Sequence, residues 1–250
     1  MTILALYSNK GGVGKTTTAV NLSYLAARIG IKTLVCDLDP QGSTSYYFRI
    51  KPKLKTGAKG FVRGGKPIVR SIKGTDYKNL DLLPADFTHR HLDTAFFNRK
   101  RSAQRLHKIL YPLKMDYELI VLDCPVSIGT LAENIFNTAD HILVPLIPTV
   151  LSLRTYAQLL TFCKENQFDR EKVLAFFSMV DNRKRMHRDI MTLVQRKFRG
   201  VQSSFVCNLS VIERMGTERQ PVPVFSPESA ASNSYRDLWS AIQAIIFSHT

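Results

Sequence analysis

The chain has 250 residues and a formal net charge of +15, and this length predicts one domain with enough residues for a full apolar core. Four scattered cysteines (Cys36, Cys124, Cys163 and Cys207) disfavour a disulfide framework or a cysteine-based zinc site. No apolar run approaches the roughly 18 residues that a membrane span needs, and the chain opens with no secretory signal pattern, so a soluble cytoplasmic protein is expected.

The first expected strand, at residues 3–8, leads into a glycine-rich loop that reads Asn9-Lys10-Gly11-Gly12-Val13-Gly14-Lys15-Thr16-Thr17. Glycines let the backbone amides approach and surround an anion. The apolar spacing of residues 15–29 predicts a helix, whose N-terminus favours negative charge. In such a loop Lys15 reaches the outer phosphates and the Thr16 hydroxyl ligates Mg²⁺. The sequence therefore predicts a nucleoside triphosphate site.

The next strand expected, Thr33–Asp37, ends in a carboxylate, and Asp39 follows in the run Asp37-Leu38-Asp39-Pro40-Gln41-Gly42. A later strand, Leu119–Asp123, also ends in a carboxylate. An aspartate that closes a strand beside a phosphate loop typically holds Mg²⁺, and Asp123 is predicted for this role. One carboxylate of the first pair is expected to position and deprotonate the attacking water. Unpaired buried carboxylates are costly, so the three acids are not typical of core filler.

The positive charge is concentrated in two segments. Residues 49–73 hold nine Lys/Arg and no Asp or Glu, residues 183–199 hold seven Lys/Arg against Asp189, and the rest of the chain is net neutral. A neutral body with two basic segments predicts contact with a polyanion, with solvated surface loops as the alternative. The glycines and prolines of 51–75 predict a long loop or a weak hairpin that turns at Gly64-Gly65, and such loops are usually functional or mobile.

Further strands are expected at 80–84, 141–145, 173–177 and 205–207, and further helices at 94–110, 128–137, 153–166, 187–198 and 230–247. Apolar strands that alternate with helices predict a doubly wound α/β domain, with a mostly parallel sheet flanked by helices, as in P-loop NTPases. We expect a single domain over 1–250, with 49–75 as a basic, loop-like insertion within it.

The last expected helix carries one continuous apolar stripe, formed by Tyr235, Leu238, Trp239, Ile242, Ile245 and Ile246. Membrane-surface helices carry several Lys/Arg on their polar face. This helix has Arg236 alone, so the stripe is expected to pack against the sheet.

These motifs resemble those of the ParA/MinD-type ATPases. Residues 10–17 resemble the deviant Walker A box, 37–42 the second motif, and 119–125 the Walker B motif. Residues 179–183 are similar to the Met-x-Asp-x-Arg segment near the adenine, and 221–235 to the C-terminal signature. Within this family the chain looks like the ParA/Soj partition proteins, whose relatives position plasmids, chromosome origins or protein cargo. The chain departs from the family at Val126, where a second proline is usual, and in the more basic segment 49–73.

The resemblance implies ATP and Mg²⁺ as cofactors and three catalytic residues, Lys10, Lys15 and Asp39. Lys10 would reach the nucleotide of a partner chain across a dimer interface, and Asp39 would activate water. Thr16, Asp37 and Asp123 would serve the metal. The implied nucleotide-binding residues are Lys10, Gly11, Gly12, Val13, Gly14, Lys15, Thr16, Thr17, Met179 and Pro227.

The resemblance also implies an ATP-bound homodimer that binds double-stranded DNA without sequence preference, is associated with the nucleoid, and has no membrane partner. A ParB-like or cargo-adaptor protein would stimulate slow hydrolysis. Candidate DNA contacts are Arg183, Lys184, Arg185, Arg188, Lys197 and Arg199. The alternatives are a MinD-like membrane-cycling regulator, disfavoured by the final helix, and a nucleotide-dependent metal or cluster carrier, disfavoured because Cys124 has no Cys-x-x-Cys partner.

Overall fold

The computed structural model describes residues 1–98 and 102–248. Within them, eight strands form one sheet in the order β3-β4-β2-β5-β1-β6-β7-β8, and β3 alone runs antiparallel to its neighbour. The strands are β1 Thr2–Leu6, β2 Thr33–Asp37, β3 Lys73–Gly74, β4 Leu80–Leu83, β5 Leu119–Asp123, β6 His141–Leu146, β7 Val173–Val180 and β8 Val201–Cys207. The predicted mostly parallel sheet is confirmed, whereas the two-residue β3 was not predicted.

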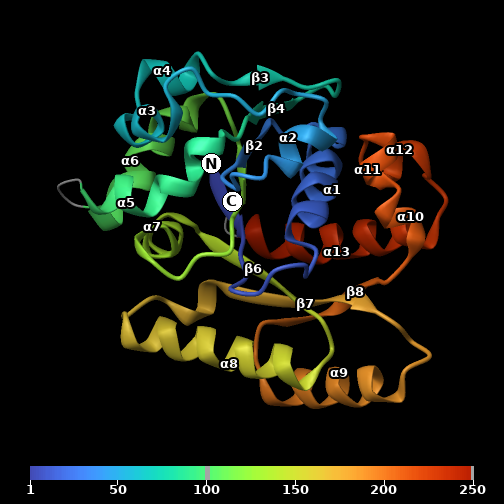
Figure 1. Ribbon diagram of the computed structural model, residues 1–250. Helices are drawn as coiled ribbons and strands as arrows, with labels where there is room; N and C mark the ends of the chain where they lie inside the picture. The colour runs from blue at the N-terminus through green and yellow to red at the C-terminus, as the bar shows by residue number, and fades with distance from the viewer. Residues whose placement is uncertain (99–101, 249–250) are drawn as a thin grey trace.

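Helices cover both faces of this sheet. In Figure 1 the sheet runs from β3 at the top to β8 near the bottom, with α5–α7 on its left and α1 and α13 on its right. The α-helices are α1 Lys15–Arg28, α2 Ser43–Tyr47, α3 Gly57–Arg63, α4 Lys66–Val69, α5 Leu92–Phe97, α6 Arg105–Leu110, α7 Thr130–Thr138, α8 Val150–Glu165, α9 Arg185–Lys197, α10 Ser210–Glu213, α11 Met215–Glu218, α12 Val222–Phe225 and α13 Ala230–Ile246. Short 3₁₀ turns are η1 Phe87–His91, η2 Ser102–Gln104, η3 Tyr111–Met115 and η4 Arg170–Lys172.

Each face of the sheet has its own apolar core, because successive side chains of a strand point to opposite faces. Ile3 and Ala5 of β1 join the core under α5–α9, whereas Leu4 and Leu6 join the core under α1 and α13. The apolar stripe of α13 is buried in this second core, so the predicted packing of that helix on the sheet is confirmed. Among the described residues, no helix is both long and apolar enough to cross a membrane.

The prediction of a long loop or hairpin at 51–75 is wrong. The segment forms α3 and α4, and Gly64-Gly65 joins these two helices instead of turning a hairpin. Phe61 and Ile68 are buried in the core, and the Ala58 N–H donates to the Thr88 hydroxyl at 2.7 Å. The glycines and the exposed lysines hide this helical pattern in the sequence, because α3 buries only three apolar side chains and α4 only one.

The continuous helix expected at 94–110 is also wrong. Helix α5 ends at Phe97, α6 begins at Arg105, and residues 99–101 lie outside the described part of the chain. The Leu106 N–H donates to the Asn134 side-chain oxygen at 3.0 Å, so a tertiary contact with α7 fixes the start of α6. A contact of this kind leaves no periodic signal in the local sequence.

Candidate nucleotide-binding site

The glycine-rich loop joins the end of β1 to the first turn of α1, in the centre of the sheet. Gly12 and Gly14 have φ of 67° and 89°, in the left-handed region that favours glycine. A Cβ on Gly14 would lie 2.9 Å from Oγ of Ser178, so the loop also needs glycine for its close approach to β7. The predicted strand–loop–helix order is confirmed. It places the loop beside the N-terminus of α1, where free backbone N–H groups bind anions.

The two lysines of the loop lie in different surroundings. Lys15, the first residue of α1, is only 8% exposed, and its positive charge acts to lower the pKa of Asp123. Lys10 is half-buried, and its Nζ lies 3.4 Å from Oγ of Ser152, in the first turn of α8. Lys15 thus faces the carboxylates of the site, whereas Lys10 lies against a neighbouring helix at the edge of the loop.

Asp37 and Asp123 are the last residues of the adjacent strands β2 and β5, and they are partners in the strand register. Both are almost fully buried. Asp37 Oδ2 accepts from the backbone N–H and the hydroxyl of Ser45, at 2.8 and 2.7 Å. Asp123 Oδ2 accepts from the Thr44 hydroxyl at 2.8 Å. The first turn of α2 therefore holds one oxygen of each carboxylate, a link that the sequence did not reveal.

Burial, and next the charge of Asp123, raise the pKa of Asp37. Burial likewise raises the pKa of Asp123, while the Thr44 and Thr16 hydroxyls and the Lys15 charge act in the opposite direction. Oδ1 of each aspartate is buried and has no hydrogen-bond partner among the described residues. A divalent cation would supply the missing partner, because Mg²⁺ prefers carboxylate and hydroxyl oxygens. The residues predicted for the metal, Thr16, Asp37 and Asp123, therefore fit such an ion.

Asp39 lies two residues beyond β2 and is half-buried. One of its carboxylate oxygens, Oδ1, accepts from the Gln41 N–H at 2.9 Å, which orients the side chain within its turn. The negative charge of Asp39 contributes to the raised pKa of both Asp37 and Asp123. The structure thus brings the three acids together at the carboxyl edge of the sheet, next to the loop, as the sequence predicted.

The C-terminal segment reaches the site through α1. Asn21 of α1 accepts from the Val222 N–H at 2.8 Å through its side-chain oxygen, and both groups are buried. Burial raises the pKa of Tyr235 to about 12, and this residue of α13 lies against the Thr17 and Thr18 hydroxyls. The Thr17 hydroxyl itself donates to the Gly14 carbonyl at 3.1 Å, so the structure gives Thr17 a role in shaping the loop.

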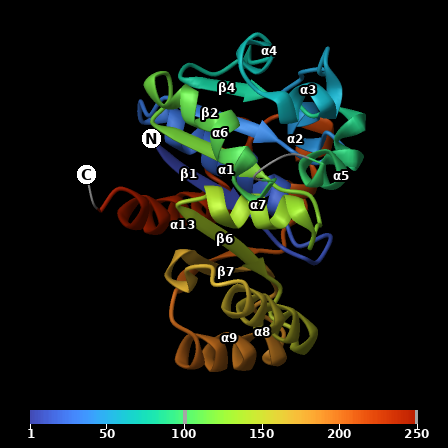
Figure 2. The same ribbon diagram turned by 90° about the vertical axis from the view of Figure 1, so that its left-hand side faces the viewer.

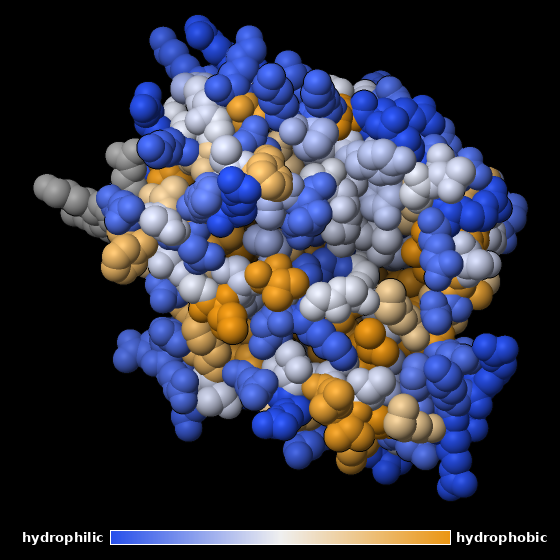
Figure 3. Space-filling view, viewed as in Figure 1, coloured by the Kyte–Doolittle hydropathy of each residue, from blue (hydrophilic) through white to orange (hydrophobic). Residues whose placement is uncertain are grey.

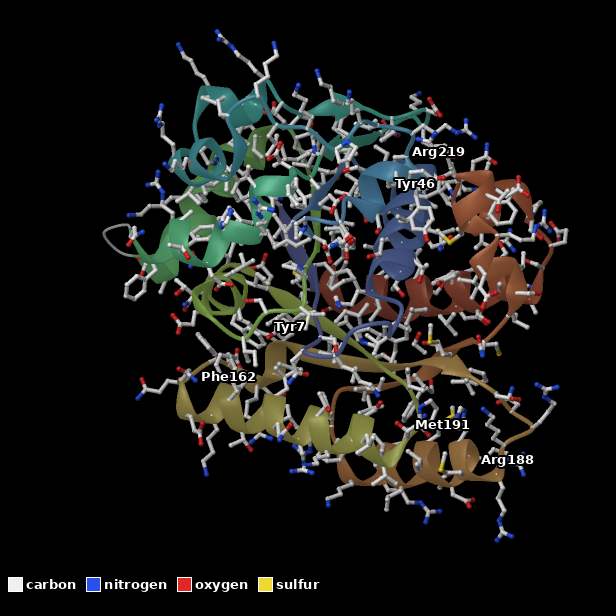
Figure 4. All side chains as sticks on the ribbon, in the orientation of Figure 1. Tyr7, Tyr46, Phe162, Arg188, Met191 and Arg219 are labelled. Carbon is white, nitrogen blue, oxygen red and sulfur yellow. The ribbon has the colours of Figure 1, made fainter. Side chains whose placement is uncertain are left out.

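Met179 and Pro227, predicted near the nucleotide, lie on different elements. Met179 has a positive φ of 54° and lies within an irregularity in the pairing of β7 with β8, between Phe177 and Val180. Pro227 is exposed in the connection between α12 and α13. Arg219, with φ of 51°, donates to the Tyr46 carbonyl at 3.0 Å and stacks on its ring at 4.5 Å, which joins α2 to this C-terminal segment (Figure 4).

The six candidate DNA contacts do not form one cluster. Lys184 precedes α9, Arg185 begins it, and Arg183 pairs with Asp181 at 2.9 Å. Arg188 follows one turn later and donates to the Asn182 carbonyl. Lys197 and Arg199 lie at the other end of α9, beside a pocket that also includes Arg170. The 13 residues of α9 separate the two groups by about 18 Å, at about 1.5 Å per residue.

Comparisons with known proteins agree with this geometry. A family model described as an AAA domain matches residues 1–176. The sporulation initiation inhibitor protein Soj of Bacillus subtilis is 27% identical over 248 residues, which cover 97% of this chain and 98% of that protein. The chromosome partitioning protein ParA of Myxococcus xanthus is 34% identical over 158 residues, which cover 63% and 56%.

Among solved structures, cobyrinic acid a,c-diamide synthase from Mycobacterium smegmatis with bound ATP analogue and magnesium shares the fold, with a TM-score of 0.85. It is 24% identical to this chain, and the match covers 100% of this chain and 97% of that one. Since the family model matches well over half of the residues and the relatives are Soj and ParA proteins, the chain belongs to the AAA domain family, within its ParA/MinD group of deviant Walker A ATPases.

Proposed function

We propose that this chain is a ParA-type ATPase that hydrolyses ATP to ADP and phosphate and uses the bound nucleotide to position a plasmid, chromosome or protein cargo. One observation carries the proposal. A phosphate loop with an inward lysine, Lys15, lies beside two buried carboxylates, Asp37 and Asp123, each with an oxygen that lacks a hydrogen bond. A structural core would not bury two such acids side by side without a ligand to neutralise them.

In this proposal, the amides of 11–17 and Lys15 hold the phosphates, and Thr16, Asp37 and Asp123 hold Mg²⁺. The metal, when bound, neutralises charge on the phosphates. Asp39 accepts a proton from the attacking water, and the Gln41 N–H keeps its carboxylate oriented. ATP and Mg²⁺ as cofactors are supported by the relatives' family and by the fit of these oxygens.

We further propose that two chains close on each other through ATP and that Lys10 then contacts the partner's nucleotide. Four apolar side chains around the loop, Val126, Ile128, Val150 and Leu151, are between 51% and 68% exposed. Figure 3 shows apolar groups on this face, over the loop before α7 and the start of α8. Exposed apolar groups gathered beside a functional loop are typical of a surface that a partner covers.

The closed dimer would bind double-stranded DNA without sequence preference and so associate with the nucleoid, and a ParB-like or cargo-adaptor protein would stimulate hydrolysis. The net charge of +15 supports a polyanionic partner. A membrane partner is disfavoured because the apolar stripe of α13, which a membrane-surface helix would have to expose, is buried in the core.

The test measures binding of the purified protein to a duplex of arbitrary sequence, with ATP, ADP or no nucleotide, over a range of salt concentrations. We expect binding with ATP that weakens steeply as salt rises; DNA binding that does not depend on the nucleotide would refute the proposal that ATP controls it.

Lys15→Ala should abolish ATP binding, whereas Lys10→Ala should bind ATP but hydrolyse it poorly. Asp39→Ala should retain ATP and lose hydrolysis, and hydrolysis at the wild-type rate would refute its role. Lys32→Ala, at an exposed position away from the loop, serves as the control.

A further inference from the structure

Five cations line a concavity of about 780 Å³ outside the nucleotide site. We call this feature the basic cradle and define it by Lys51, Lys53, Lys55, Arg70 and Lys73. The first three belong to the connection between α2 and α3, Arg70 follows α4, and Lys73 begins the edge strand β3. All five residues are exposed.

Among the residues that the structure describes, no carboxylate lines the cradle. In the described part of the chain, none of its five cations forms an ion pair, whereas the neighbouring Arg49 pairs with Asp76 at 3.3 Å. The positive charges of the cradle are therefore not paired with a carboxylate at ion-pair distance, and the acid that lies near them, Asp86, accepts from the Leu54 N–H. Uncompensated like charges repel one another, so their grouping around one concavity indicates an anionic ligand.

The cradle is held by the core rather than carried on a loose loop. Leu54 is buried between Lys53 and Lys55, and its N–H donates to Asp86 Oδ2 at 2.9 Å. Ile68, two residues before Arg70, is also buried. Because the backbone between the cations is anchored, a ligand would not have to order the whole segment on binding, which lowers the entropic cost.

The concave form of the cradle favours one kind of polyanion. A duplex presents a phosphate ridge with a negative charge about every 1.7 Å of helix axis, and a ridge can enter a groove. A bilayer presents a flat surface, whose headgroups would reach only the rim. We propose that the basic cradle binds the phosphodiester backbone of double-stranded DNA; this inference deepens the proposed function and rests on it.

The cradle would be a second contact, separate from the residues of α9. The cradle lies at β3 and α9 packs beyond β8, at opposite edges of the eight-stranded sheet. Seven strand spacings of about 4.8 Å put these edges roughly 34 Å apart. Figures 1 and 2 both show α4 and α9 at opposite ends of the molecule, and Figure 4 shows Arg188 at the α9 end. One phosphate group cannot contact both sites, so substitutions at the cradle and at α9 should lower DNA affinity independently.

The experiment measures the salt dependence of duplex binding by the full chain with ATP, for the double variant Lys53→Gln/Lys55→Gln. Each lost phosphate contact lowers the magnitude of the slope of log K against log salt by about 0.9, so two contacts should lower it by about 2. If the affinities are equal at 1 M salt, this corresponds at 0.1 M salt to roughly 60-fold weaker binding. Lys53→Arg/Lys55→Arg should restore the slope, and Lys108→Gln/Lys164→Gln, with the same change in charge elsewhere, should leave it near the wild-type value.

Basal ATP hydrolysis, which the double variant should retain, reports that its fold is intact. An unchanged slope in this variant, while the wild type binds DNA with ATP, would refute the cradle and leave the proposed function standing. A wild type that binds no duplex with ATP would refute both. Loss of binding to vesicles of anionic lipid, with duplex binding unchanged, would assign the cradle to a membrane and also overturn the inference.

Discussion

Ser45→Ala tests how the chain holds the acids of its nucleotide site. The Ser45 hydroxyl donates to Asp37 Oδ2 at 2.7 Å and accepts from the Ala85 N–H at 3.0 Å, and all three groups are buried. Removing this hydroxyl takes one hydrogen bond from a carboxylate, worth about 1.5–3 kcal/mol, and leaves a backbone N–H unsatisfied, at about 1–3 kcal/mol. Both hydrogen bonds involve the same hydroxyl oxygen, so one local readjustment can offset part of both losses. We therefore expect the free energy of unfolding to fall by about 3 kcal/mol in total.

The assay is urea and thermal unfolding of the nucleotide-free protein at pH 9, where Asp37 is ionised, because burial and the charge of Asp123 raise its pKa to about 8. For a chain of this size, a loss of about 3 kcal/mol should lower the midpoint temperature by roughly 6–12 °C. Ser43→Ala, the same change two residues earlier at a half-buried position, should stay within about 0.5 kcal/mol of the wild type. A Ser45→Ala variant no less stable than Ser43→Ala would refute the reasoning. In an Asp37→Asn background the cost of Ser45→Ala should shrink, because the charged acceptor is gone.

Three further predictions concern the loop, the cradle and the core. Gly14→Ala should lower stability by about 1–2 kcal/mol more than Gly12→Ala, because both have positive φ but a Cβ at position 14 alone would crowd Ser178; equal thermal midpoints would contradict this. Burial acts to raise the pKa of Asp86, but hydrogen bonds from one hydroxyl and two backbone amides outweigh it and lower this pKa. The stabilisation of the fold by the Asp86 carboxylate is therefore present above about pH 4 and lost as the pH falls further. Asp86→Asn should thus lower the stability of the protein at pH 7 and lower it much less at pH 3. Leu238→Ala, at a fully buried position, should cost about 2–5 kcal/mol in urea unfolding, and a cost below 1 would contradict its place in the core.

The sequence predicted the central strands because they are buried on both faces and read as near-continuous apolar runs. It predicted the loop because glycines and lysines directly follow the first strand. It predicted the acids of β2 and β5 because aspartates stand at the ends of those strands. It could not predict α3 and α4, whose few buried side chains lie between exposed lysines. Nor could it predict that Thr44 and Ser45 hold the two carboxylates, because no local pattern records a contact between the start of α2 and the end of β5.

The resting contact of Lys10 has a kinetic consequence. Its Nζ lies 3.4 Å from the Ser152 hydroxyl, at the long end of hydrogen-bond distances. A contact worth about 1 kcal/mol leaves the side chain detached for roughly a sixth of the time, and such rotamer changes take nanoseconds at a protein surface. Release of this lysine is then far faster than the meeting of two chains. Assembly of a two-chain site should therefore follow second-order kinetics in protein concentration, with no slow unimolecular step at Lys10.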